Sequence, residues 1–328
     1  MGRTGCIVIP ARVHFCWIGN RLPWAYVFAI LSAAERSELP EIILHHTDIL
    51  EDGAELRALR NSGRVQMSRI DARACLEQAE QALGLGGELV AIYLRLQSPV
   101  MRTDILRAAI LYLNGGIYLD LDTVTTASLR PLLNASQFVG SELIVWPYAV
   151  RASRSPARWL RHIALDLLRK VFRWMPNGWK SFRLVENFYF RGVNNAVMGA
   201  EANAPLFSDY LRAMCAMPLE RQTQPYALGP DLLQEVVDRY RGQDLTVHGP
   251  DIFYPLPPEI SEHWFRIGRD VRLSEVLSTQ TRVVHWYASV RTKSRVARIT
   301  PDYVREHQSR QLYSALICSC IRHLPDAI

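Results

Sequence analysis

The stretch NGGIYLDLDT, residues 114–123, joins a strand signal to two acidic residues that no folding rule requires. Two glycines lead into a short apolar run, and Asp120 and Asp122 follow that run. Because alternate side chains of an extended chain point to the same face, the two carboxylates are expected only a few ångströms apart. The sequence therefore predicts a carboxylate pair at the end of a strand.

Two carboxylates on one face repel each other unless a positive charge lies between them. A hard divalent cation such as Mg²⁺ or Mn²⁺ is the usual one. Mg²⁺ takes one or two carboxylates and completes its shell with water and substrate phosphates, so a diphosphate ligand is the natural partner. The alternative is a strand that ends in a solvated acidic turn, and the Asp-x-Asp pattern alone does not decide between the two.

Composition places the chain among globular proteins. It has 328 residues, of which 49% are hydrophobic and 21% charged, enough for one large domain or two ordinary ones. We find no run of 18 or more apolar residues, so we expect neither a membrane span nor a secretory signal. Six cysteines show no paired metal-binding spacing, which predicts reduced thiols in a cytoplasmic protein.

Strand and helix signals alternate along the first third of the chain. This alternation is typical of a mixed, mostly parallel sheet flanked by helices, the α/β class, in which ligands bind beyond the carboxyl ends of the strands. The expected strands are residues 7–18, 41–46 and 64–70, and the expected helices are residues 24–36, 51–61 and 72–83.

A helix with clear ends runs directly into the acid pair. Ser98 is a good N-cap residue and Gly115 supplies the stop. Asp104 and Arg107 are three residues apart on this helix, so they are neighbours, and the wheel places them opposite its apolar arc. The ordinary interpretation is a surface ion pair of little energetic worth, but the position of the helix makes both residues candidates for the site.

One segment makes the protein basic. Residues 151–183 contain nine Lys or Arg and one acid, a net +8, and since the whole chain is +6 the remainder is −2. A helix through this segment suits an anionic membrane surface, although Arg stems and Trp rings also cover ordinary core faces. No nucleic-acid motif accompanies it, so a nucleic-acid partner is not expected. The apolar residues at helical spacing are Trp159, Leu160, Ile163, Leu167, Val171 and Trp174, with Arg158, Arg161, Arg169, Lys170 and Arg173 among them.

The run SPVMRTDILRAAILYLNGGIYLDLDT, preceded upstream by IPARVHFCWIG, resembles the family 32 glycosyltransferases, the DXD sugar-binding region group. It is also similar to the glucosyltransferase domain of the large clostridial toxins. The resemblance is close over residues 1–30 and 95–125, and looser around Asn194-Asn195, Gly229-Pro230 and His285.

The resemblance implies a GT-A type nucleotide-diphospho-sugar transferase fold. It implies one domain over residues 1–290, with a basic helical insertion at about 151–183, and a C-terminal helical extension over residues 291–328. The family often closes its site with a late Ser-Trp pair, whereas Ser289 is followed here by Val290. The implied roles are Trp17 on the donor base, Asp104 and Arg107 on the transferred sugar, Asp120 and Asp122 on the sugar-nucleotide and the metal, Tyr118 close by, and His285 as a metal or diphosphate ligand or else a core histidine.

We therefore expect a hexosyltransferase that uses Mn²⁺ or Mg²⁺ and a UDP-sugar or GDP-mannose type donor, with retention of anomeric configuration. The acceptor would be a hydroxyl of a capsule or other cell-surface polysaccharide or of a glycolipid, and the enzyme cytoplasmic or peripheral on the inner membrane face. A secreted effector that glycosylates a host protein is the alternative acceptor class.

A phosphatase or phosphotransferase of the haloacid-dehalogenase type is the alternative chemistry, because Asp120 after an apolar strand fits its nucleophile. Such an enzyme also needs a lysine and late acids. The chain has three lysines and no adjacent acid pair downstream, which disfavours this alternative. A third alternative is a basic module, built around residues 151–183, that binds a membrane or nucleic acid without catalysing a reaction; it explains neither the acid pair nor the helix before it.

Overall fold

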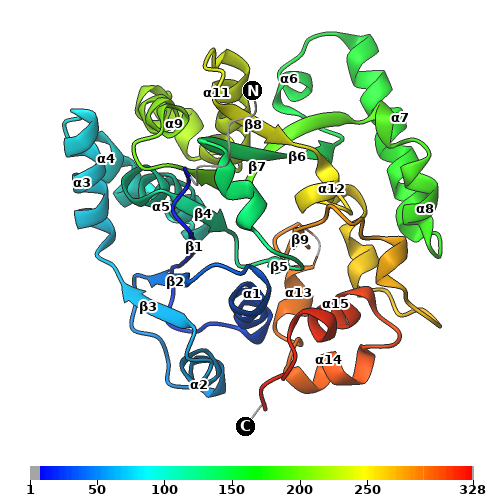
Figure 1. Ribbon diagram of the computed structural model, residues 1–328. Coiled ribbons are helices and arrows are strands. Elements are labelled where there is room, and N and C mark those ends of the chain that lie inside the picture. Colours follow the sequence, from blue (N-terminus) through cyan, green and yellow to red (C-terminus); the bar gives the residue numbers. More distant parts are fainter. Residues whose placement is uncertain (1–7, 291, 327–328) are drawn as a thin grey trace, which may run out of the picture.

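A seven-stranded mixed sheet organises the chain, shown in Figure 1 as a computed structural model that describes residues 8–290 and 292–326. Four of its six strand pairings are parallel, and β7 lies antiparallel between β4 and β6. The predicted α/β class, with a mixed and mostly parallel sheet flanked by helices, is confirmed. In sheet order the strands are β3 (Val65–Arg69), β2 (Glu41–His46), β1 (Arg12–Trp17), β4 (Gly116–Leu119), β7 (Phe190–Ala200), β6 (Gln137–Ile144) and β8 (Leu245–His248).

Helices cover both faces of this sheet, and a core cluster lies on each face. Period-two alternation divides the strands between them, so that Val13 and Phe15 of β1 face one cluster and Cys16 faces the other. The helices of the first cluster include α1 (Trp24–Arg36), α2 (Ala54–Asn61) and α15 (Leu312–Cys320). Those of the second are α3 (Ala72–Leu83), α4 (Glu88–Arg95), α5 (Pro99–Asn114), α9 (Pro205–Ala216) and α11 (Leu232–Arg239).

Shorter elements and two basic helices complete the described chain. Among the described residues, no helix combines the length and apolar character that crossing a bilayer requires. The remaining helices are α6 (Tyr148–Arg151), α7 (Pro156–Trp174), α8 (Gly178–Arg183), α10 (Leu219–Gln222), α12 (Pro250–Phe253), α13 (Lys293–Val296) and α14 (Pro301–His307). Short 3₁₀ or π segments occur at Arg130–Asn134, Glu186–Phe188, Ala227–Asp231, Pro258–Phe265 and Leu273–Glu275.

A second, two-stranded sheet joins a late part of the chain to the residues that follow the acid pair. Strand β5 (Thr123–Thr125) pairs antiparallel with β9 (Val283–His285), and in that register Thr123 faces His285. The pairing brings a late segment of the chain beside the residues that follow β4.

The structure corrects three expectations about single elements. Within the described chain the first strand begins at Arg12, because Pro10 cannot donate to a ladder, and residue 7, where the strand was expected to begin, lies outside the described residues. The helix α4 was not predicted. The interpretation of α5 as one-sided was wrong, since α5 lies against the sheet, α3 and α9 and buries Asp104 and Arg107.

The turn from α5 into β4 explains the two glycines of the opening stretch. Gly115 and Gly116 have φ of +62° and +108°, where side chains are strained. A Cβ on Gly115 would lie 2.7 Å from the backbone nitrogen of Ala202, and one on Gly116 would lie 2.9 Å from Nε2 of His14. His14 also bonds through Nε2 to the carbonyl of Gly115 at 2.9 Å. The motif histidine of β1 therefore fixes the turn that sets the start of the acid-bearing strand.

Candidate functional site

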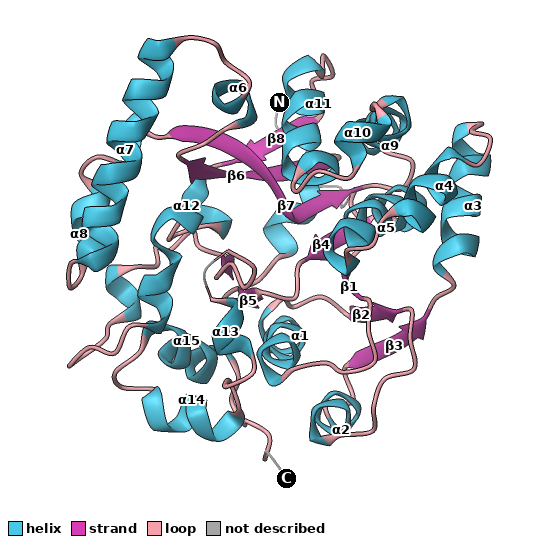
Figure 2. Cartoon of the chain, turned by 180° about the vertical axis from the view of Figure 1, so that it is seen from behind, coloured by secondary structure: helices cyan, strands magenta, loops and turns pink. Residues whose placement is uncertain are grey.

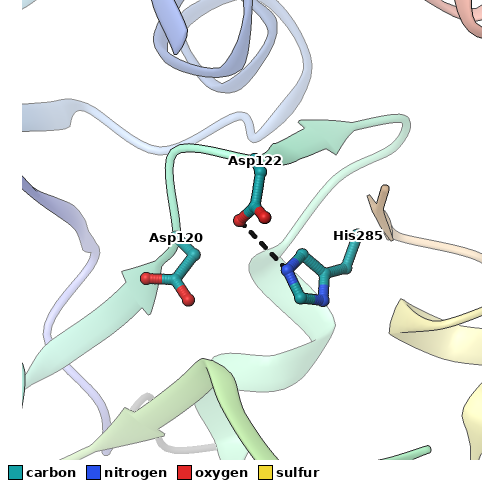
Figure 3. A group of neighbouring side chains, drawn as sticks. All are labelled: Asp120, Asp122 and His285. Carbon is teal, nitrogen blue, oxygen red and sulfur yellow. Dashed lines mark ion pairs between the residues drawn. The ribbon is translucent and has the colours of Figure 1, made fainter. Parts of the chain in front are cut away.

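Asp120 and Asp122 lie where the chain passes from the seven-stranded sheet to the two-stranded sheet. The backbone N–H of Asp120 donates to the carbonyl of Ala196 on β7 at 2.8 Å, which continues the β4 pairing by one residue. Asp122 lies in the following turn and points at His285, as Figure 3 shows. Ligand atoms of Asp120, Asp122 and His285 all lie within 4.8 Å of one another. The structure thus brings together the three residues that the sequence suggested for a metal.

Asp120 is held on both carboxylate oxygens. Arg107 Nη1 donates to Oδ2 at 3.0 Å, and the Tyr118 hydroxyl donates to Oδ1 at 2.9 Å. Tyr118 can reach because residues two apart on a strand share a face. Burial raises the pKa of Asp120 to about 6, with Arg107 opposing and the charge of Asp122 adding to the rise. Two carboxylates this close are a strained pair until a cation joins them.

Asp122 is stabilised as an anion from the opposite side. Burial acts to raise its pKa, but the charge and hydrogen bond of His285, with Nε2 3.0 Å from Oδ1, and the N–H of Ala288, 2.7 Å from Oδ2, together lower it. The same contact raises the pKa of His285 despite its burial. Tyr287 has a left-handed backbone with φ of +58°, and it is the residue that directs the Ala288 N–H toward Asp122.

Asp104 and Arg107 form a buried pair behind Asp120. Arg107 Nη2 lies 3.4 Å from Asp104 Oδ1, and its Nη1 also donates to the carbonyl of Asn195 at 2.9 Å. The Asn195 amide donates to Asp104 Oδ1 at 2.8 Å. Gly229 approaches the same carboxylate so closely that a Cβ would lie 2.9 Å from Oδ2. The looser matches around Asn195 and Gly229 therefore converge on one place, and only 4% of the Arg107 side chain is exposed there.

Trp17 stands at the mouth of the sheet beside the acid pair. Parallel pairing of β1 with β4, continued past the strand end, places Trp17 level with Leu121. The Trp17 ring is half-buried and lies 5.3 Å from the Tyr26 ring, which in turn lies 6.5 Å from Trp286. Trp286 itself is buried in the core. The late tryptophan is therefore a packing residue, whereas Trp17 keeps part of its surface open.

Sequence reasoning missed a second polar network next to His285. Glu142 on β6 is buried and accepts from the Tyr287 hydroxyl at 2.7 Å and from the Asn194 amide at 2.8 Å. The Tyr287 ring lies 4.0 Å from the His285 ring. Glu142 carried no usable signal, because its contact with Tyr287 joins residues far apart in sequence.

A cavity of about 810 Å³ lies away from this site. It is between α1, α2 and the C-terminal segment, and it is lined by residues such as Glu35, Arg57 and His323. None of the acid pair, Arg107 or His285 lines it. The candidate site residues lie instead at the carboxyl end of β4, as described above.

Comparison with known proteins agrees with this placement. Residues 49–139 match the family described as "Glycosyltransferase sugar-binding region containing DXD motif". A search of curated protein sequences finds no match.

Solved structures with related arrangements are glycosyltransferases. The PaToxG glycosyltransferase is 14% identical, with 70% of this chain and 69% of that one covered and a TM-score of 0.43. Mouse xyloside xylosyltransferase 1 is 12% identical, with 84% and 96% covered and a TM-score of 0.43. The bifunctional glycosyltransferase WbbM is 10% identical, with 100% and 52% covered and a TM-score of 0.46. Because these TM-scores are low, the enzyme class rests on the family match and on the site.

The family match over residues 49–139 identifies the protein as an enzyme that transfers sugars, a glycosyltransferase. The matched stretch contains Asp120-Leu121-Asp122, which has the form of the family's DXD motif. The expected resemblance to the DXD sugar-binding region family is confirmed for this stretch.

Proposed function

We propose that this glycosyltransferase has a GT-A type fold and moves a hexose from a nucleotide-diphosphate sugar to an acceptor hydroxyl with retention of configuration. The observation that carries the proposal is the convergence of Asp120, Asp122 and His285 at the carboxyl end of β4. Parallel sheets of this kind bind ligands beyond that end of their strands. A carboxylate pair there suits a ligand with a diphosphate and a divalent cation.

The residues at this place fit a metal ion. Two carboxylates and an imidazole are ligands that Mn²⁺ accepts, and the carboxylates also suit Mg²⁺. The Nε2 atom of His285 faces the acid pair, 3.0 Å from Asp122 Oδ1, so this nitrogen could reach an ion held by the carboxylates (Figure 3). We propose Asp122 as the first ligand, with Asp120 and His285 beside it. When bound, the ion would neutralise charge on the leaving diphosphate.

The donor would lie along the edge of the sheet from Trp17 to Asp104. Trp17 offers an aromatic face for the base of a UDP-sugar or GDP-mannose type donor. Tyr118 and Asp120 would meet the ribose and sugar region. Asp104 and Arg107 would hold the transferred sugar, since a guanidinium and a carboxylate can together grip sugar hydroxyls.

The chain's own groups would act by positioning. Arg107 and Tyr118 hold Asp120 in one orientation, and His285 with the Ala288 N–H holds Asp122, so neither carboxylate needs to reorganise during transfer. With retention, the leaving phosphate can itself accept the proton of the attacking hydroxyl. No separate general base is then required, and catalysis rests on orientation and electrostatics.

The proposed acceptor is a cell-surface polysaccharide, such as a capsule, or a glycolipid, and the proposed location is the cytoplasm at the inner membrane face. The net +8 of residues 151–183 favours an acceptor at an anionic surface. Glycosylation of a host protein by a secreted effector is the second candidate, and a protein acceptor in a transfer assay would favour it.

A donor panel tests the reaction. Purified protein with UDP- and GDP-sugars should release UDP or GDP only when Mn²⁺ or Mg²⁺ is present, and Asp122→Asn should lower that release by two orders of magnitude or more, on the order of the loss of a main catalytic electrostatic contact. Asp52→Asn is the matched control, because Asp52 is an exposed acid paired only with Arg60. Release that is independent of metal would overturn the proposed metal dependence, and phosphate trapped covalently on Asp120 would replace the proposal with the phosphotransferase alternative.

A further inference from the structure

Helix α7 presents a continuous apolar stripe to solvent. Leu160 is 69% exposed, Leu167 is 56% exposed and Trp174 is 71% exposed. At 100° per residue they lie within one narrow arc, together with Ile163 and Val171, which are also exposed. Single exposed apolar residues are ordinary, but five on one helix face form a patch that calls for a partner.

This stripe is not the face by which α7 packs on the protein. The buried residues of α7 are His162, Leu165, Arg169 and Phe172, which fall on the opposite side of the helix. His162 bonds to the carbonyl of Val145, and Phe172 belongs to the core cluster with α1. Helix α7 therefore packs on the core by the side opposite the stripe, and the interpretation of the exposed stripe as a core face was wrong.

Positive charge lies near the stripe. Lys170 borders it on the helix wheel, whereas Arg161 lies farther round, toward the buried face, and both are exposed. Arg154 and Arg158, at the start of α7, are exposed and form no ion pair within residues 8–290 and 292–326. The single acid of residues 151–183, Asp166, is already paired with Arg169 and Lys170.

The patch lies on the rim of the molecule and extends beyond α7. In Figures 1 and 2, which view the molecule from opposite sides, α7 and α8 form the edge opposite α3 and α4. The segment that returns to β7 lies beside α7, because Arg161 donates to the carbonyl of Phe188 at 3.2 Å. Phe188 and Leu184 in this segment are exposed as well.

We infer that the α7 stripe docks on an anionic lipid bilayer. An amphipathic helix with Leu and Trp on one side and flanking Arg and Lys binds in the plane of the headgroups, with its apolar face buried and its cations on anionic lipid. A second copy of the chain fits less well, since a two-fold contact would set the basic flanks of the same patch against each other. The inference stands whether or not the proposed donor chemistry holds, because it uses other residues.

Vesicle flotation tests the docking. The full chain should float with vesicles of phosphatidylcholine and phosphatidylglycerol and stay behind with phosphatidylcholine alone. Replacing Leu160, Leu167 and Val171 by Ser should lower the partition coefficient on the order of a hundredfold. Arg154→Glu with Arg158→Glu should lower it by about tenfold or more, and added salt should weaken wild-type binding.

Matched controls separate docking from general surface chemistry. Leu94, Leu219 and Val247 are about as exposed as the stripe residues and lie on other elements, so their triple replacement by Ser should leave flotation unchanged. Arg269→Glu with Arg298→Glu is the corresponding charge control. The inference would be overturned if wild-type protein did not float with anionic vesicles, or if the stripe variants floated like wild type. A dimer in light scattering that the stripe variant abolishes would assign the patch to a second copy instead.

Discussion

Lowering the pH from 7 to 5 should destabilise the protein through the buried pair His14 and His45. His14 Nδ1 lies 2.9 Å from His45 Nε2, and the other His14 nitrogen is engaged by Gly115. Burial lowers the pKa of His14 to about 3 and that of His45 to about 4, with the charge of His45 adding to the first shift and the charge of His46 to the second. Both rings are therefore neutral in the folded protein throughout this range.

The size of the effect follows from these pKa values. In the unfolded chain each ring has a pKa of about 6.5, so at pH 5 the unfolded state binds one proton per ring that the folded state does not bind. Each ring then costs about 2 kcal/mol of stability between pH 7 and pH 5, and the pair about 4 kcal/mol. The stability is fully present above the unfolded pKa and is lost as the pH falls below it.

Urea unfolding at the two pH values measures this, with a variant that isolates one ring. His45→Gln keeps a donor facing His14 but cannot be protonated, so its apparent loss of unfolding free energy between pH 7 and 5 should be smaller than that of wild type by about 2 kcal/mol. His323→Gln removes an exposed histidine and is the control. If His45→Gln and wild type lost stability equally, the pair would not be neutral in the fold and the reasoning would fail.

Three further outcomes test the site. Gly115→Ala should lower the free energy of unfolding by about 3–5 kcal/mol, because the new side chain strains the backbone and clashes with the backbone of Ala202. Gly63 has the same φ of +62° but nothing within 4 Å, so Gly63→Ala should cost only about 1 kcal/mol in the same urea assay. Equal losses for the two variants would refute the packing argument. Tyr287→Phe removes a partner of buried Glu142 and should cost about 1–3 kcal/mol, a loss that a double cycle with Glu142→Gln should show to be non-additive; simple additivity would contradict the network. His285→Ala should weaken Mn²⁺ binding, followed by calorimetry, by about tenfold or more, and unchanged affinity would remove His285 from the ligand set.

Local sequence signals predicted much of the secondary structure. The helix over residues 72–83 was predicted to its observed bounds because Gly84 stops it in a left-handed conformation and Asp71 caps its start. The strand over residues 41–46 was equally visible, as a short apolar run between turn signals. In both cases the information lies within a few residues of the element.

Contacts between distant residues could not be predicted in this way. The burial of Asp104 and Arg107 depends on α9 and on the turn at Gly229, which pack over a helix whose own pattern indicated a free side. The contact between Glu142 and Tyr287 joins β6 to the segment that follows β9, and no local periodicity relates the two. Tyr118, by contrast, was predictable as a neighbour of Asp120, because strand alternation alone puts both on one face.

The pairing of β5 with β9 has a consequence for how the enzyme is made. Asp122 emerges from the ribosome early, whereas His285 follows only after 163 further residues. The seven-stranded sheet is likewise incomplete until β6, β7 and β8 have been synthesised. Until β9 has been made, Asp122 therefore lacks both its histidine and the Ala288 N–H, and a nascent chain cannot assemble the proposed ligand set. A translation product that stops before β9 would hold the stretch that matches the sugar-binding region without the contacts that fix Asp122.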